Sequence, residues 1–159
     1  MLLVASDRGL RSAEFDYDMK RLASVRQNKD WTESDATLAD TRRQLDEYFA
    51  GKRTEFTVPL DLRGTDFQLR CWNALLKIPY GKTCSYADLA RTVGSPRGFR
   101  AVGMANHDNP IPIIVPCHRV ITSDHKLGGY GGGLDVKEKL LHLEGAVWRE
   151  PHPELAFAE

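Results

Sequence analysis

Residues 85–106 read SYADLARTVGSPRGFRAVGMAN, and this stretch decides the fold of the second half of the chain. Ser85 is a typical helix N-cap. Asp88, three residues later, makes a weak version of the capping box, so we expect a short helix to begin at this point. Gly94 is a natural stop for that helix, because glycine readily adopts the backbone conformation found just after helix ends.

A second helix is expected directly after the first. Ser95 is placed to cap it, with Pro96 at its first position, where the missing backbone N–H costs nothing. This helix would cover residues 97–106. Two short helices joined by a tight turn that contains glycine have the outline of a helix-turn-helix. Many helical hairpins share this outline and bind nothing, so the pattern alone leaves DNA binding open.

The segment after this helical pair is apolar and rich in proline. Residues 109–116 contain three prolines, which make regular sheet pairing unfavourable. We expect an extended, rigid, buried segment that carries Cys117 and its neighbours into the interior. The glycine-rich loop over 128–133 lacks the residues of a phosphate-binding loop. A last helix is expected over 135–144.

The first half begins with two short apolar segments, 2–5 and 10–15, on either side of an Asp-Arg-Gly turn, which predicts a hairpin. Residues 16–35 are polar and poorly patterned, so irregular structure is expected there. One helical face is formed by Leu38, Leu45, Tyr48 and Phe49. Residues 56–62 contain Pro59 and are expected to form an edge strand or an extended linker.

A helical stripe opens the second half. It consists of Phe67, Cys71, Leu75 and Ile78, with Trp72 beside it. Cys71 is therefore interpreted as a core residue. The whole pattern predicts an α/β (α+β) fold class: a small antiparallel sheet with a helix over 1–60, followed by a mainly helical domain over 61–159 that contains the helix-turn-helix.

Composition limits the functional classes only loosely. The 159 residues carry 22 basic and 22 acidic side chains, so net charge argues neither for nor against nucleic acid. The three cysteines are odd in number and irregularly spaced, which is not a disulfide framework and fits a reducing compartment. The apolar start is too short for a signal peptide, and no apolar run is long enough to span a membrane. These features predict a soluble, cytoplasmic protein.

Cys117 is the candidate nucleophile, followed directly by His118. A cysteine attacks as its thiolate, so a base or a positive neighbour must assist it. Adjacent side chains point to opposite sides of an extended chain, so a bridging water or a turn would be needed to join the pair. The histidine would itself need a carboxylate, for which Glu144 is one of several candidates. A Cys-His pair in an apolar setting is more often packing than catalysis, and no pair has metal-ligand spacing.

Several segments occur in the order found in one known family. They are Gly64–Phe67, Ile78–Gly81, Ser85-Tyr86, Arg100–Gly103, Asn109–Arg119, Gly129-Tyr130 and Leu143–Gly145. In these the chain resembles the O6-alkylguanine-DNA alkyltransferases, also called methylated-DNA–protein-cysteine methyltransferases. The resemblance covers nearly all of the second half. The first half matches loosely, as a ribonuclease-H-like domain that is short at its start.

The resemblance implies a role for each matching residue. Cys117 would accept the alkyl group, and His118 would act as base through a water, oriented by Glu144. Asn109 would brace the turn before the active-site segment. Tyr86 would donate a hydrogen bond to the leaving guanine, so that it departs as a neutral base. The thioether product leaves no route back to the thiol, so the protein would act once and need no cofactor.

The expected partner is double-stranded DNA that contains O6-alkylguanine, bound through its minor groove by a monomer with the damaged base flipped out. Arg100 would fill the gap that the base leaves. The other expected DNA contacts are Ser85, Tyr86, Phe99 and Ala101. The expected substrate pocket consists of Pro112, Val120, Tyr130 and Gly131. O4-alkylthymine stays open as a second substrate.

Two positions depart from the family pattern. Phe99 stands where a small residue is usual, and could either wedge against the minor groove or turn inward. Gly131 stands where some members have serine. Three alternatives remain: a lesion sensor without transfer activity, which typically replaces the reactive cysteine; a helix-turn-helix regulator with incidental cysteines; and a cysteine hydrolase, which would need a more distant histidine.

Overall fold

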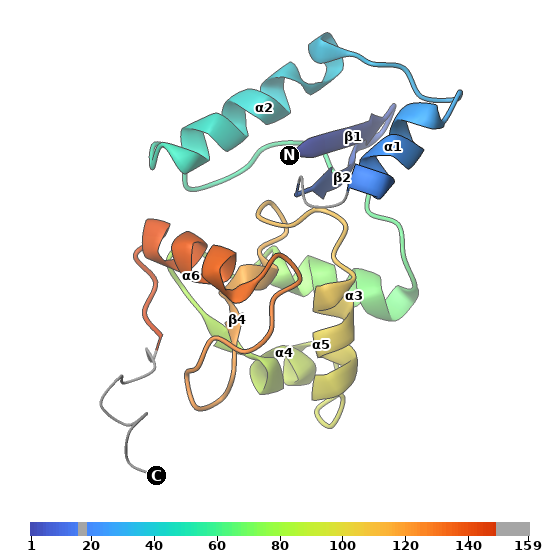
Figure 1. Ribbon diagram of the computed structural model, residues 1–159. Helices are drawn as coiled ribbons and strands as arrows, with labels where there is room; N and C mark the ends of the chain where they lie inside the picture. The colour runs from blue at the N-terminus through green and yellow to red at the C-terminus, as the bar shows by residue number, and fades with distance from the viewer. Residues whose placement is uncertain (16–18, 149–159) are drawn as a thin grey trace. The chain divides into compact units, whose positions relative to one another are not determined.

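The computed structural model describes residues 1–15 and 19–148 (Figure 1). Its contacts divide the chain into two compact units. One unit consists of Met1–Arg63 with Pro110–Ile114, and the other of Gly64–Asn109 with Val115–Glu159. The proline-rich segment after the helical pair is therefore shared between the two units. No helix of the described residues is long and apolar enough to cross a membrane.

The first unit is built on the predicted hairpin, which is confirmed. Strands β1 (Leu2–Ser6) and β2 (Gly9–Glu14) pair antiparallel, with a register shift after Val4. The segment before residue 63 runs extended along β2: Leu10 N donates to Pro59 O at 2.8 Å, and Asp61 N donates to Leu10 O at 2.8 Å. Of the two expected forms of residues 56–62, the extended linker is therefore observed, with one isolated bridge between Leu10 and Leu60.

Helices α1 (Met19–Gln27) and α2 (Asp35–Phe49) complete this unit, and α2 runs alongside the hairpin (Figure 1). The prediction of irregular structure over 16–35 is wrong for α1. Its residues are mostly good helix formers, so intrinsic propensity supports a helix although the apolar pattern is weak. Residues 16–18 lie outside the described residues. On α2, Leu45 and Tyr48 are buried as predicted, but Phe49 is 49% exposed, since it lies at the edge of the face formed by the buried Thr41, Gln44, Leu45 and Tyr48.

The prediction of an extended segment through residues 110–116 is only partly correct. Ile111 and Ile113–Val115 are buried, as expected. The chain, however, turns at Ile113, whose φ is 76°. Such a backbone conformation is strained for a β-branched residue and must be held by its surroundings. Pro110 O accepts from Ala13 N at 3.0 Å, which attaches this turn to β2.

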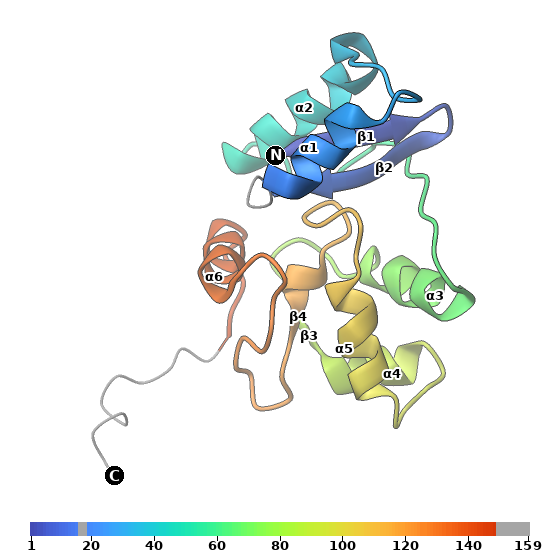
Figure 2. The same ribbon diagram turned by 45° about the vertical axis from the view of Figure 1, so that its right-hand side comes forward.

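The second unit contains most of the helices. They are α3 (Asp66–Leu75), α4 (Tyr86–Thr92), α5 (Phe99–His107), a 3-10 turn η1 (Cys117–Arg119) and α6 (Leu134–Leu143). Helices α3, α4 and α5 pack together, and the short strands β3 (Cys84–Ser85) and β4 (Val120–Ile121) lie between this group and α6 (Figure 2). Cys71 is fully buried on α3, as interpreted, and Trp72 Nε1 donates to Ala105 O at 2.8 Å.

The helix-turn-helix expectation is correct in outline, with one wrong cap. Ser85 caps α4 in a complete capping box with Asp88. Ser95 does not cap α5, which begins at Phe99 after Gly98 and has no side-chain cap. Ser95 O instead accepts from Gly98 N at 2.7 Å, so residues 95–98 form a turn. A Cβ at position 98 would lie 2.2 Å from the rotatable Ser95 Oγ and 3.1 Å from both Ser95 Cβ and Ser95 O, so this tight turn favours glycine and delays the helix.

Candidate active site

Cys117 lies at the start of the 3-10 turn that ends the proline-rich segment. Directly after this turn, β4 pairs in parallel with β3, which aligns Val120 with Cys84 and Ile121 with Ser85. Because β3 directly precedes α4, this pairing places the beginning of α4 next to β4, the strand that follows the turn with Cys117. The backbone adopts a turn at Cys117, which is one of the two solutions expected for the adjacent cysteine and histidine.

The Cys117 side chain is buried and contacts an amide. It is 6% exposed, and Asn109 Nδ2 donates to its Sγ at 3.1 Å and to Val115 O at 2.7 Å. Burial raises the pKa of the Cys117 thiol, while the Asn109 hydrogen bond, the charge of Lys137 and the backbone N–H groups of Cys117 and His118 oppose this rise. The free protein therefore holds a protonated thiol whose surroundings favour the thiolate once its proton is removed.

His118 is fully buried and paired with a carboxylate. Its Nε2 lies 2.7 Å from Glu144 Oε1. Burial lowers the pKa of His118, although Glu144 opposes this effect, so the imidazole is neutral at pH 7. A neutral imidazole carries one N–H proton, and because Nε2 faces the Glu144 carboxylate, the proton is on Nε2. Its Nδ1 is then an acceptor, and it has no hydrogen-bond partner among the described residues.

Arg119 also binds Glu144, in a pairing that the sequence did not predict. Its Nε donates to Oε2 at 2.9 Å and its Nη2 to Oε1 at 3.0 Å, while Nη1 donates to Ile78 O at 2.6 Å. The Gly81 backbone N–H also donates to Glu144 Oε2, at 3.2 Å. Gly81 has a φ of 73°, and a Cβ there would lie 2.9 Å from Glu144 O. The signal that could have found this pair is an arginine in a buried segment, which needs a carboxylate.

Lys137 is the second functional candidate that the sequence did not predict. It is fully buried on α6, and its Nζ donates to the carbonyls of Val120, Leu127 and Gly129. Burial lowers the pKa of Lys137 to about 8, although the neighbouring Cys117 opposes this shift. Lys137 shares a helix face with the buried Leu140 and Leu141, and this inward position was the available signal. Its ammonium therefore attaches α6 to the loop that follows β4.

Tyr86 lies against the same loop. Its hydroxyl donates to Gly129 O at 3.3 Å, and a Cβ on Gly128, where φ is 71°, would lie 3.1 Å from the tyrosine ring. Burial raises the pKa of the Tyr86 hydroxyl, with smaller contributions from Cys117 and Cys84. The phenol is therefore protonated and can donate. The structure thus brings Cys117, Asn109, His118, Glu144 and Tyr86 together within the second unit.

Two family profiles match the chain. The profile of the 6-O-methylguanine DNA methyltransferase DNA binding domain matches residues 66–146, and that of the 6-O-methylguanine DNA methyltransferase ribonuclease-like domain matches residues 1–62. The chain belongs to the 6-O-methylguanine DNA methyltransferase family. The segment that contains Cys117, the helical pair and the last helix all fall within the first of these matches.

Individual relatives cover most of the chain. The methylated-DNA–protein-cysteine methyltransferase of Methanosarcina barkeri is 48% identical over 144 residues, which are 91% of this chain and 89% of the relative. That of Mycobacterium bovis is 58% identical over 114 residues, 72% of this chain and 69% of the relative. The crystal structure of Mycobacterium tuberculosis OGT in complex with DNA has a TM-score of 0.80 at 48% identity and covers 90% of this chain and 84% of its own.

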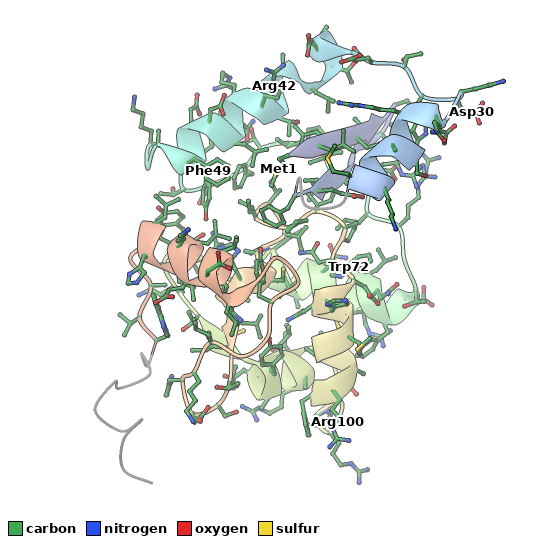
Figure 3. The ribbon with its side chains drawn as sticks, in the orientation of Figure 1. Met1, Asp30, Arg42, Phe49, Trp72 and Arg100 are labelled. Carbon is green, nitrogen blue, oxygen red and sulfur yellow. The ribbon has the colours of Figure 1, made fainter. Side chains whose placement is uncertain are left out.

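The expected DNA-contacting residues of this family member lie on or near α4 and α5. Phe99 is 50% exposed, so it does not turn inward, and Arg100 and Ala101 are exposed beside it. The Arg100 side chain lies near the N-terminus of α5 and points away from the protein (Figure 3). Ser85 is partly buried, with its hydroxyl engaged in the α4 cap.

The four expected pocket residues are not all in one unit. Val120 is fully buried, Tyr130 is partly buried and Gly131 is exposed, and all three belong to the second unit with Cys117. Pro112 is partly buried and belongs to the first unit. Among residues 1–15 and 19–148, no three His, Cys, Asp or Glu side chains gather in a way that could hold a metal ion.

Proposed function

We propose that this protein repairs DNA by transferring the alkyl group of O6-alkylguanine to Cys117. The observation that carries the proposal is the arrangement of Cys117, held by Asn109, beside a neutral His118 that Glu144 orients. Membership of the 6-O-methylguanine DNA methyltransferase family, whose relatives are named for transfer to a protein cysteine, supports it.

His118 acts as the general base in this proposal. Its Nε2 proton stays on the Glu144 side, and Nδ1 accepts the Cys117 proton through one bridging water. Glu144 stabilises the resulting imidazolium. Arg119 keeps Glu144 ionised and in place, because it binds both carboxylate oxygens. The hydrogen bond from Asn109 and the nearby charge of Lys137 stabilise the thiolate sulfur.

The transfer itself is a displacement at the alkyl carbon. A sulfur–carbon bond forms as the bond between that carbon and O6 of guanine breaks, and the electron pair of the broken bond remains on the purine. Tyr86 donates a hydrogen bond and then its proton to the purine, which leaves as a neutral base, and the proton that His118 took from Cys117 replaces it on the Tyr86 oxygen through water. The thioether cannot return to a thiol through any group in the site, so each molecule reacts once.

DNA binding is proposed for the exposed face of α5, in the minor groove of a duplex. The target carbon is hidden in the duplex, so the guanine must flip out. Arg100 fills the vacated stack, for which a planar guanidinium is well suited. His107, at the other end of α5, is seven positions after Arg100, a distance of about 10 Å along a helix axis. The N-terminal end of α5 can therefore fill the gap in the base stack, while its other end, at His107, lies near the flipped base.

The test is Cys117→Ser, with transfer of a labelled methyl group from duplex O6-methylguanine as the readout. A serine hydroxyl is far less acidic than a thiol, so transfer should be lost while binding to the damaged duplex is kept. A Cys71→Ser variant, altered at a buried cysteine outside the site, controls for general effects and should keep transfer. A Cys117→Ser protein that still repairs would overturn the proposal.

A further inference from the structure

The last turn of α5 carries a buried amide that the proposed reaction does not use. Asn106 is 8% exposed, and neither its Oδ1 nor its Nδ2 has a hydrogen-bond partner among the described residues. A buried amide without partners is destabilising, so its presence needs an explanation.

Asn106 belongs to the part of α5 that borders the acceptor thiol. Its carbonyl accepts from Asn109 N at 3.2 Å, and the Asn109 side chain in turn contacts Cys117 Sγ. The next residue, His107, lies beside the glycine loop, since a Cβ on Gly131 would be 3.7 Å from His107 Nδ1. The turn that holds Asn106 therefore lies between Asn109, which contacts the thiol, and the loop expected to line the substrate pocket.

The helix itself gives no reason for an amide at this position. Asn106 shares the inward face of α5 with Val102, one turn earlier, and both are buried. An apolar side chain such as leucine has nearly the same shape, has a better helix propensity and would leave no unsatisfied group. The amide is therefore better explained by a ligand that reaches it than by folding.

We propose that Asn106 forms hydrogen bonds with the alkylated purine that reaches Cys117 and helps to select it. An amide offers two N–H donors and an acceptor oxygen, and a guanine edge presents donors and acceptors side by side. A buried polar group that only the correct ligand satisfies discriminates strongly against ligands that cannot bond to it. This inference rests on the proposed transfer to Cys117 and adds a specificity-determining residue to it.

The test compares Asn106→Leu with the unaltered protein. The rate of methyl transfer from duplex O6-methylguanine should fall about tenfold or more, as for a lost hydrogen bond in a buried site. The Tm of the free protein should instead rise by about 2 °C or more, because an unsatisfied amide has been removed. Asn73→Leu, at an exposed position of α3, is the matched control and should leave both quantities unchanged. Asn106→Ala should also lose rate, which shows that leucine does not merely block the site.

Duplexes with altered bases can identify the purine atom to which Asn106 forms its hydrogen bond. O6-methylated purines that lack the 2-amino group, ring N3 or ring N7 should each be tested with both proteins. For at least one of them, the rate difference between the unaltered protein and Asn106→Leu should disappear. Equal slowing of every base would assign Asn106 a structural role and overturn the inference, as would an unchanged rate with O6-methylguanine. If the unaltered protein transfers nothing, the proposed function itself fails.

Discussion

At the scale of single residues, the site depends on the buried carboxylate of Glu144, which binds two side chains at once. Glu144 faces both His118 and Arg119, and all three side chains are removed from solvent. A buried ion pair contributes little net stability, but losing one partner leaves an uncompensated charge. The pair is therefore best understood as a device that keeps Glu144 ionised and oriented toward the base.

Replacing Arg119 with methionine should consequently destabilise the protein strongly. We expect a loss of about 3–5 kcal/mol in the free energy of unfolding, measured by urea denaturation. Arg91→Met removes the exposed pair with Asp88 on α4 and should change stability by at most about 1 kcal/mol. Equal effects of the two substitutions would contradict the role given to the buried pair.

The pH dependence of transfer also belongs to this scale. Burial lowers the pKa of His118 below its ordinary value of 6.5, so the base stays neutral as the pH falls to that value. Burial raises the pKa of Cys117 above its ordinary value of 9.0, so the thiol does not titrate on its own below that pH. The single-turnover rate constant should therefore be flat between pH 6.5 and about 7, and it should fall as the pH rises through about 8, where Lys137 loses the charge that stabilises the thiolate. A rate that climbs steadily with pH over this range would indicate an unassisted thiol.

At the scale of secondary-structure elements, the capping residues show what local sequence can and cannot decide. Ser85 and Ser95 both stand before a helical pattern, and only Ser85 makes the predicted capping bonds. The difference arises from Gly98, which extends the turn after Ser95 and moves the start of α5 to Phe99. The capping and stop residues therefore predicted both helices, while the exact start of the second depended on a backbone turn.

Substitution of the two serines makes this contrast measurable. Ser85→Ala should lower the free energy of unfolding by about 1 kcal/mol, because an N-cap hydrogen bond is lost. Ser95→Ala should change it by less than about 0.5 kcal/mol, as expected for a residue that caps nothing. Thermal denaturation of both variants is the measurement, and a larger effect at Ser95 would contradict the observed start of α5.

At the scale of the whole molecule, local patterns predicted the hairpin and the helical pair, while the resemblance to a known family named most of the residues that gather at Cys117. The sequence did not predict α1, whose apolar pattern is weak, nor the turn at Ile113, where a β-branched residue takes a positive φ. Arg119 and Lys137 were missed as well, because their importance depends on partners 25 and 17 residues away in the chain, Glu144 and the Val120 carbonyl. A pattern of polar and apolar residues predicts which side chains are buried. It does not predict which buried charged side chains pair with each other.

The measurement that tests the central proposal most directly is the mass of the intact protein after mixing with excess duplex that contains one O6-methylguanine, followed by peptide mapping. Self-alkylating repair predicts the gain of one methyl group in place of one hydrogen, confined to the peptide with Cys117 and stopping at one per chain. An unchanged mass with the duplex still bound would contradict transfer and identify a lesion sensor. A methyl group found on Cys71 or Cys84 instead would contradict the assignment of the acceptor.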